Sequence, residues 1–217
     1  MKSKKNLLEQ LKSLPHFSKD SLFQLGKQLG LADATVDTYI SRFLRHKEIL
    51  QLKKGLYIST DFFSKNRSDI SYSFYLANII RTPSYVSSWS ALQFYNLTTE
   101  AIHSFTSITP KVTRNYKTKA GNFTYQSIKK DLFLDFSLMQ GKSALSADRP
   151  LEKFNFFIAS PAKALFDLLY FKTHQFRGIR SKDIKSLVEK LRIDIDEMVK
   201  NERSKFNTMI KKHLSHE

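Results

Sequence analysis

The first sixty residues follow an order of segments that restricts the fold more than any other feature of the sequence. Leucines recur at helical spacing over 4–14, and Pro15 ends that run. A second leucine-rich helix is predicted over 19–30. After a turn of about three residues, a third helix is predicted over 34–49, with Asp33 as its expected N-cap. Helix, helix, short turn and helix form the first part of a winged helix-turn-helix.

A β-hairpin is predicted directly after the third helix. Two apolar runs, Ile49–Leu52 and Leu56–Ile58, flank Lys53, Lys54 and Gly55. Glycine adopts the positive φ that a tight turn needs, so the two lysines are expected at the tip of the ribbon. In a winged helix-turn-helix these ammonium groups would reach phosphates or the minor groove, and the order of elements favours this interpretation. A solvated basic turn, or a winged helix that docks a protein, is the alternative.

The predicted third helix has one apolar face and one polar face. Its apolar positions are Val36, Ile40, Phe43 and Leu44. The side chains that then point outward or flank the core are Ala34, Thr35, Thr38, Ser41, Arg42 and Arg45. Short polar groups let a helix sit deep in the major groove, and arginine binds guanine edges or phosphates, so we expect the hydroxyl groups to face bases and the arginines to hold the helix on DNA. Asp37 fits this interpretation only if it pairs with Arg42 or Lys19, or accepts from a cytosine amine.

The charge of the chain indicates a polyanionic partner. Lysine and arginine number 36 against 20 acids, a net charge of +16, which is typical of proteins that bind nucleic acid or an anionic membrane face. Residues 1–58 hold 11 bases and 5 acids, and 111–130 hold six bases and no acid. No run approaches the ~20 apolar residues of a membrane span, and the chain has no cysteine for a disulfide or a zinc site. We therefore expect a cytoplasmic protein without a membrane partner.

The second cationic segment, 111–130, interleaves bases with aromatic residues. Its bases include Lys111, Arg114, Lys117 and Lys119, and its aromatic residues are Tyr116, Phe123 and Tyr125. Such a segment can extend a DNA footprint or face an acidic protein partner. It is also typical of a solvated strand edge on which lysines prevent aggregation. The sequence leaves these three interpretations open.

The organisation beyond the hairpin indicates a larger domain of mixed α+β class. We assign 1–60 to the winged helix-turn-helix, the polar segment 61–70 to a linker, and 71–217 to the second domain. The predicted elements of the second domain are a helix at 71–80, a helix within 82–98, strands at 104–109, 121–128 and 154–160, a buried helix that begins at Ser160-Pro161, and two amphipathic helices. A modest sheet covered by helices satisfies this pattern.

Three segments together resemble the AbiEi-type antitoxin family. They are "KKGLYI" after the helix-turn-helix, "YVSSWSALQFYNLT" and "IASPAKALFDLLYF". The middle signature of the family is a Ser-Ala-Leu helix that ends in Tyr-Gly-Leu, and it is matched by Ser90, Ala91, Leu92 and Tyr95, with Asn96 in place of the glycine. The later signature, Ala-x-Pro-Glu-Lys-Ala-Leu-x-Asp, is matched at Pro161, Lys163 and Asp167, whereas Ala162 replaces the glutamate.

The resemblance implies a transcriptional regulator of a bacterial abortive-infection system, a type IV toxin–antitoxin pair that acts in phage defence. It implies that the winged helix binds inverted repeats in double-stranded DNA of the operon promoter and represses it. It also implies that the second domain opposes a nucleotidyltransferase-like toxin, with or without direct contact. The replacement at Ala162 matters if the family glutamate serves toxin antagonism, and matters little if that glutamate only supports the first helical turn.

No catalytic signature is present in the sequence. The six glycines are scattered rather than gathered in a phosphate-binding loop, and the six histidines form no His-Glu-x-x-His motif. Lys163 and Asp167, four residues apart, are interpreted as a surface or half-buried ion pair rather than an acid–base couple. We therefore expect no catalytic residue, cofactor or metal. The main alternative is a stand-alone winged-helix regulator whose second domain binds a ligand or oligomerises, and an enzyme is a third.

Overall fold

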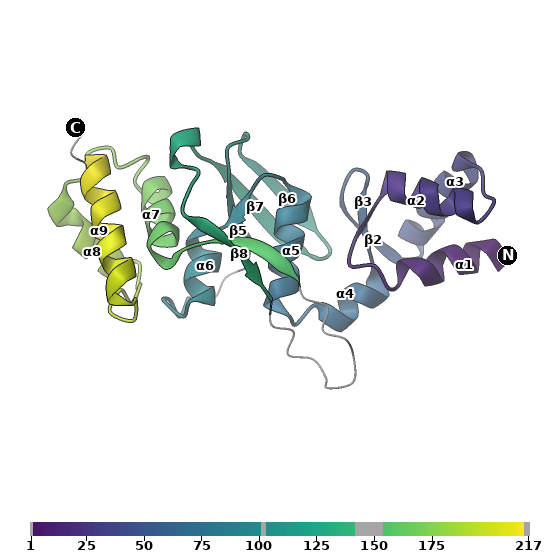
Figure 1. Cartoon of the computed structure of the whole chain (residues 1–217), viewed down its shortest axis with the longest axis horizontal. Helices are drawn as coiled ribbons and strands as arrows, with labels where there is room; N and C mark the ends of the chain where they lie inside the picture. Colours follow the sequence, from purple (N-terminus) through teal and green to yellow (C-terminus); the bar gives the residue numbers. More distant parts are fainter. Residues whose placement is uncertain (1, 101–102, 142–153, 215–217) are drawn as a thin grey trace.

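The computed structural model describes residues 2–100, 103–141 and 154–214 of the chain. These residues form an elongated molecule with the N-terminal helices at one end, a six-stranded sheet in the middle and the C-terminal helices at the other end (Figure 1). The strands form two separate sheets and are accompanied by many helices, so the predicted α+β class is confirmed. Within the described ranges, no helix combines the length and the apolar content that crossing a membrane requires.

Three helices and three short strands make up the N-terminal unit, residues 2–59. Their bounds are α1 Lys2–Leu11, β1 Phe17–Ser18, α2 Lys19–Gln28, α3 Asp33–Arg45, β2 Ile49–Lys53 and β3 Leu56–Ser59. The three helices and the hairpin agree with the sequence-based prediction, and the strands form a small antiparallel sheet in the order β1-β3-β2. The apolar faces of the helices enclose a core that includes Leu22, Val36 and Phe43, as helical periodicity requires.

Helices α2 and α3 approach one another closely at Gly26. A Cβ atom added to Gly26 would lie 2.3 Å from Cγ2 of Val36, well inside van der Waals contact, so glycine permits this helix crossing. The start of α3 differs from the prediction. Ala32 occupies the N-cap position without a side-chain hydrogen bond, and Asp33 lies in the first turn, where its charge still favours the helix N-terminus.

The segment predicted to be a linker is largely helical. Helix α4 spans Thr60–Asn66, and the hydroxyl of Ser59 accepts a hydrogen bond from the backbone N–H of Phe62. The ring of Phe62 is buried against the rings of Tyr72 and Phe154. This anchor is the physical difference from the polar linker expected over 61–70, because one buried aromatic side chain fixes the helix against Tyr72 and Phe154.

A six-stranded mixed sheet forms the centre of the second unit, residues 60–214. Its strands are β4 Tyr85–Val86, β5 Phe105–Thr109, β6 Arg114–Thr118, β7 Gly121–Ser127, β8 Phe136–Gln140 and β9 Asn155–Ala159. Their order across the sheet is β6-β7-β5-β4-β9-β8, with β6 and β8 at the two edges. The predicted strands are present as β5, β7 and β9. The edge strands β6 and β8 were not predicted, because neither of them buries a full alternating face.

Helices pack around the sheet of the second unit. Their bounds are α5 Ile70–Ile80, α6 Ser88–Phe94, the 3-10 helix η1 Lys130–Leu132, α7 Pro161–Lys172, α8 Ser181–Lys190 and α9 Lys200–Leu214. Helix α5 lies on β4, β5 and β9, and α7 packs between α6 and α9. The predicted start of α7 is confirmed, since the hydroxyl of Ser160 accepts from the backbone N–H of Lys163 and Pro161 occupies the first helical turn.

The ribbon of β2 and β3 contributes side chains to the cores of both units. Leu50, Leu52 and Ile58 belong to the core of the second unit, whereas Ile49 and Tyr57 belong to the core of the N-terminal unit. Strand β2 also lies against β6. The ribbon is therefore packed between two bodies, which differs from a wing that is free along its length.

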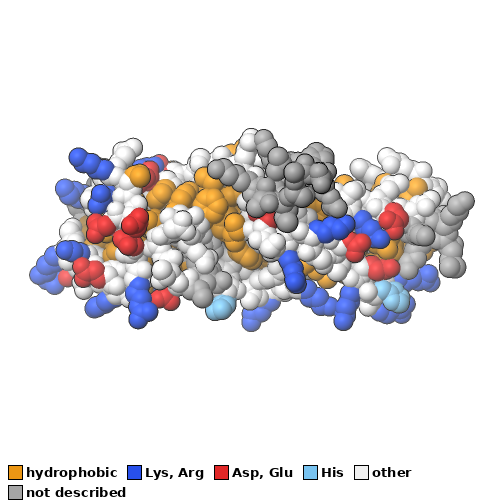
Figure 2. Space-filling model, turned by 90° about the horizontal axis from the view of Figure 1, so that it is seen from below, with side chains coloured by type: hydrophobic (Ala, Val, Ile, Leu, Met, Phe, Trp, Pro, Cys, Tyr) orange, Lys and Arg blue, Asp and Glu red, His pale blue; other side chains and the backbone are white. Residues whose placement is uncertain are grey.

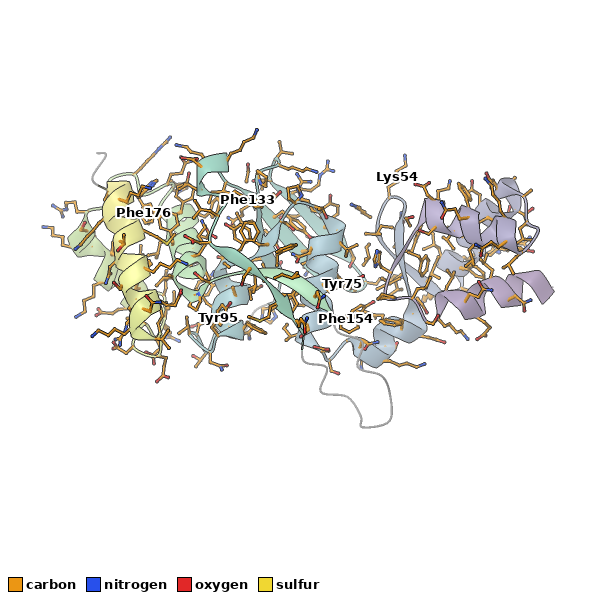
Figure 3. All side chains as sticks on the ribbon, in the orientation of Figure 1. Lys54, Tyr75, Tyr95, Phe133, Phe154 and Phe176 are labelled. Atoms are coloured by element: carbon orange, nitrogen blue, oxygen red, sulfur yellow. The ribbon has the colours of Figure 1, made fainter. Side chains whose placement is uncertain are left out.

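Tyrosines of α5 join the second unit to the N-terminal unit. The hydroxyl of Tyr72 donates to the carbonyl of Pro15 at 2.8 Å, and the hydroxyl of Tyr75 lies 2.6 Å from Nδ1 of His16. The ring of Tyr75 packs against that of Phe154 beside this junction (Figure 3). Burial lowers the pKa of His16, so its imidazole favours the neutral form in the folded protein.

Candidate nucleic-acid interface

Helix α3 presents its predicted polar face to solvent. The exposed side chains of this face are Ala34, Thr38, Ser41, Arg42 and Arg45, and Thr35 is half-buried. Two of its hydroxyl groups donate to carbonyl oxygens one turn earlier on the helix, each at 3.0 Å, and their oxygen atoms stay accessible as acceptors. The guanidinium groups of Arg42 and Arg45 form no ion pair with another described residue, so both are available to phosphates or guanine edges.

Asp37, the acid in the middle of this helix, forms an ion pair within the N-terminal unit. Lys19 Nζ lies 2.8 Å from Asp37 Oδ1. The hydrogen bond to Asp37 raises the pKa of Lys19, so the ammonium group of Lys19 stays charged at neutral pH. This is one of the pairings under which the sequence allowed Asp37 next to phosphates, and it removes the local repulsion.

Lys19 also connects helix α3 with the tip of the ribbon. Its backbone N–H donates to the carbonyl of Gly55 at 2.9 Å, while its side chain reaches Asp37 on α3. Gly55 has φ +77°, as the predicted tight turn requires. Lys54 is exposed and points away from the body of the protein (Figure 3), so its ammonium group is free for a ligand.

Lys53 does not share this exposure. Its Nζ donates a 2.6 Å hydrogen bond to the carbonyl of Ile80 at the end of α5, and the side chain is half-buried. A cation at a helix C-terminus is favourable because the last carbonyl groups carry partial negative charge. The sequence placed both lysines at a solvent-exposed tip. In the structure Lys53 fixes the ribbon to the second unit and Lys54 alone is free.

The second cationic segment begins beside the same helix end. Lys111 Nζ donates to the carbonyl of Thr82 at 2.6 Å, and Arg81 donates to the carbonyl of Val112. The side chains of this segment that are exposed are Lys111, Arg114, Lys117 and Lys119. Because β6 lies against β2, these cations lie on the second unit close to the ribbon, at the junction of the two units.

The environment of Tyr116 reflects the local excess of positive charge. Burial acts to raise the pKa of Tyr116, but hydrogen bonds from Arg114 and Arg81, together with their charges, lower it overall.

Residues 70–99 and 111–130 contain no acid. Viewed from below, Lys and Arg side chains follow one long edge of the molecule from the N-terminal unit to the far end (Figure 2). This charge distribution suits a polyanion longer than the contact of α3 alone.

Residues of the two family signatures meet in the second unit around a buried ion pair. Lys163 Nζ lies 2.5 Å from Asp167 Oδ1, and both side chains have 0% exposure. The hydroxyl groups of Ser87 and Tyr85 donate to Asp167 Oδ2 at 2.7 and 3.0 Å. Burial raises the pKa of Asp167, opposed by Lys163 and by the two hydroxyl donors. The predicted surface or half-buried pair was wrong, because α7 lies between α6 and α9 and this pair faces inward.

Ser87 and Tyr85 were missed as partners of this ion pair. Ser87 precedes α6 and looks like a helix cap in sequence, but its side chain makes no cap bond and turns to Asp167, 80 residues later. No pattern of neighbouring residues predicts such a contact.

Ser90 and Tyr95 connect α6 with the sheet. Ser90 exchanges hydrogen bonds with Thr106 across α6 and β5, and Tyr95 donates to the carbonyl of Ala159 at 2.9 Å. The signature residues therefore hold α6 against the sheet and α7.

The surroundings of four further signature positions explain their residue types. Ala91 and Leu92 are fully buried in the core of the second unit. Asn96 has φ +58°, the left-handed conformation that a glycine would otherwise supply at the end of α6. Ala162, which replaces the family glutamate, donates its backbone N–H to Glu202 Oε2 of α9 at 2.9 Å.

A cavity of about 450 Å³ is lined by residues from the first turn of α6 and from the C-terminal end of α8. It is lined by Trp89, Glu100, His103, Ser104, Thr106, Lys190 and Leu191. Its size falls in the range of small-molecule sites, roughly 300–1,000 Å³. Among the described residues, no group of three or more His, Asp or Glu side chains could hold a metal ion, and the absence of a cofactor stays a prediction.

No protein-family model matches this chain, and no curated protein matches its sequence.

Proposed function

We propose that this chain is a DNA-binding transcriptional regulator whose N-terminal unit acts as a winged helix-turn-helix, with α3 as the recognition helix. The observation that carries the proposal is the face of α3. It combines accessible hydroxyl groups with two guanidinium groups that form no ion pair with any residue in the described part of the chain, and Lys19 pairs with Asp37. Direct readout in the major groove uses these side-chain types.

The wing in this proposal is reduced to its turn. Lys54 contacts phosphate beside the recognition helix, and Gly55 lets the backbone approach the duplex. Lys53 positions the ribbon through Ile80 and does not contact DNA. The exposed cations Arg114, Lys117 and Lys119 continue the phosphate contact along β6 and its turn, and Lys111, whose ammonium group bonds to the carbonyl of Thr82, adds positive charge just before them. This arrangement favours DNA over a solvated edge as the interpretation of the second basic segment.

The biological role that we propose is autorepression within a type IV toxin–antitoxin system. Its support is the resemblance of three segments to the AbiEi-type antitoxins, together with the meeting of two of these segments across α6 and α7. The regulator would bind inverted repeats in its own promoter, and the second unit would oppose a nucleotidyltransferase-like toxin. A gene for such a toxin next to this one, and rescue of growth when both are expressed, would support this role.

The DNA-binding proposal is tested by fluorescence anisotropy with a duplex from the region upstream of the gene. Arg42→Ala/Arg45→Ala should weaken binding by at least tenfold, which follows from losing about 1–3 kcal/mol per base-reading contact. The matched control is Lys182→Ala/Lys185→Ala, which removes two exposed cations from α8 and leaves α3 intact. Equal affinity of the two variants would reject α3 as the recognition helix.

The cavity favours a second candidate, a regulator that responds to a small molecule. Trp89 is the single tryptophan of the chain and lines the cavity, so its fluorescence reports on occupancy. A metabolite that quenches Trp89 and shifts DNA affinity in the wild type, with both effects lost in Lys190→Ala, would support this candidate. The expectation that the chain is no enzyme is checked separately, by incubation with nucleic acid and a divalent metal.

A further inference from the structure

The two edges of the central sheet differ in chemistry. Edge strand β6 carries Arg114 and Lys117, and charged side chains are a common protection of an edge against pairing with another chain. Edge strand β8 and its neighbour β9 contain no charged residue. Asp135, directly before β8, is already paired with Lys205 at 3.2 Å. In a chain of net charge +16, β8 therefore forms an unusual neutral edge.

The register of β8 shows which backbone groups face outward. The backbone N–H of Ser160 donates to Asp135, and that of Gly141 donates to Phe154, each at 3.0 Å. Bonded and non-bonded pairs alternate along an antiparallel ladder, so every second residue of β8 directs its N–H and C=O away from β9. The outward-directed residues are Phe136, Leu138 and Gln140. No other strand of the described chain pairs with β8 on this side.

Apolar side chains are accessible at the centre of this edge and directly before it. Leu138 is 57% exposed, and Phe157, its direct partner on β9, is 41% exposed. Leu134 before the strand is 44% exposed, and the ring of Phe136 lies 5.8 Å from that of Phe157. A free row of backbone groups flanked by apolar side chains is the combination that pairs with another strand.

We propose that β8 is the site at which a second copy of this chain binds, through antiparallel pairing of β8 with β8. The outward-directed residues are centred on Leu138, so a two-fold axis beside Leu138 satisfies all of their backbone groups. It places Phe136 opposite Gln140 of the other copy and the two Leu138 side chains side by side. Two six-stranded sheets then join into one continuous sheet.

The charge of the chain selects this edge for self-association. Two copies with a net charge of +16 each repel one another over most of their surfaces, and the cationic β6 edge cannot pair with itself. Strand β8 removes this obstacle because neither copy brings a charged side chain to the new ladder. The inference does not depend on the proposed DNA binding, since it is tested on protein alone.

The first test is the mass of the full chain in solution without DNA, measured by light scattering after size-exclusion chromatography. A mass that approaches twice 25.3 kDa with rising concentration is expected for the wild type. Leu138→Lys should be monomeric, because it places two ammonium groups together at the two-fold axis. The control is Val112→Lys, at a position that is 74% exposed near β6, and it should dimerise like the wild type. A wild type that is monomeric at every concentration, or a dimeric Leu138→Lys, overturns the proposal.

The second test covers a Leu138→Lys variant that fails to fold, which far-UV circular dichroism would reveal. The chain has no cysteine, so Leu138→Cys introduces the single thiol. A short bismaleimide should join two copies of Leu138→Cys rapidly and should leave Val112→Cys mostly monomeric. Equal yields from the two variants indicate random collision and overturn the proposal. If the chain is a monomer and binds a foreign strand-forming peptide at β8, the occupant of β8 is another protein and the proposal of a second copy is overturned.

Discussion

Glu202 of α9 accepts a hydrogen bond from the backbone N–H of Ala162 in the first turn of α7, at 2.9 Å. The position of Ala162 is the one at which the AbiEi-type signature carries glutamate. A carboxylate at this helix N-terminus satisfies an N–H group that has no partner within the helix. Here the carboxylate comes from another helix, 40 residues later. Burial and, secondly, the charge of Glu202 raise the pKa of Tyr95 to about 12, so Glu202 also lies near the end of α6.

Glu202→Gln should lower the free energy of unfolding by about 0.5–2 kcal/mol, because the first turn of α7 loses a charged hydrogen-bond acceptor. Urea denaturation followed by circular dichroism measures this loss. Glu197→Gln, at an exposed position shortly before α9, serves as the control and should change stability little. If Glu202→Gln is as stable as the control, the carboxylate does not support α7.

Asp167→Ala should destabilise the protein strongly, by about 3–5 kcal/mol, because the ammonium group of Lys163 would remain buried without its partner. Replacing both residues by apolar ones, as Lys163→Met/Asp167→Leu, should recover much of the loss. Thermal unfolding of the three proteins measures these differences. Equal destabilisation by the single and the double replacement would show that the hydroxyl donors Ser87 and Tyr85, and not the ion pair, control stability at this site.

The stability of the protein should depend on pH through His16. Burial lowers the pKa of His16 below its usual 6.5, so the unfolded chain binds a proton more readily than the folded protein. The contribution of neutral His16 is complete above pH 6.5 and is lost as the pH falls through the lower pKa of the folded state. Denaturation at a series of pH values should show a shallower fall for His16→Gln than for the wild type. His174→Gln, at an exposed position, should follow the wild type.

Arg42 and Lys54 should differ in what they contribute to DNA binding. Arg42→Ala should cost about 1–3 kcal/mol and change the preferred base sequence, because a guanidinium group on α3 can read guanine. Lys54→Ala should weaken binding to all sequences alike and flatten the dependence on log salt by about one unit. Titrations on the promoter duplex and on an unrelated duplex, at several salt concentrations, separate these outcomes. If Arg42→Ala loses the same affinity for both duplexes, Arg42 contacts a phosphate and does not read a base.

Lys53→Ala should act on the junction of the two units rather than on the salt dependence. Its ammonium group bonds to the carbonyl of Ile80, so the replacement frees the ribbon from the end of α5. Hydrogen exchange of the backbone amides in β2 and β3 should become faster, while the slope of affinity against log salt stays that of the wild type. The opposite result, unchanged hydrogen exchange with a flatter slope of affinity against log salt, would show that Lys53 contacts DNA.

Much of the N-terminal unit follows from short-range signals in the sequence. The apolar spacing of Val36, Ile40 and Phe43 determines the buried face of α3, and Gly55 determines the turn of the ribbon, because each signal acts within a few residues. The N-cap Ser160 was likewise recognisable from residue type, and the left-handed conformation of Asn96 fits its place in the family signature, where asparagine replaces a glycine. These features need no knowledge of distant parts of the chain.

Only the tertiary structure decided which polar groups are free and which are occupied. Lys53 and Lys54 are adjacent and chemically identical, yet one bonds to α5 and the other faces solvent, because β2 and β3 pack on the second unit. Ser87 reaches Asp167 across 80 residues of sequence, and Glu202 reaches Ala162 across 40. Such contacts depend on how the helices and the sheet pack on one another, and the local spacing of residues does not predict that packing.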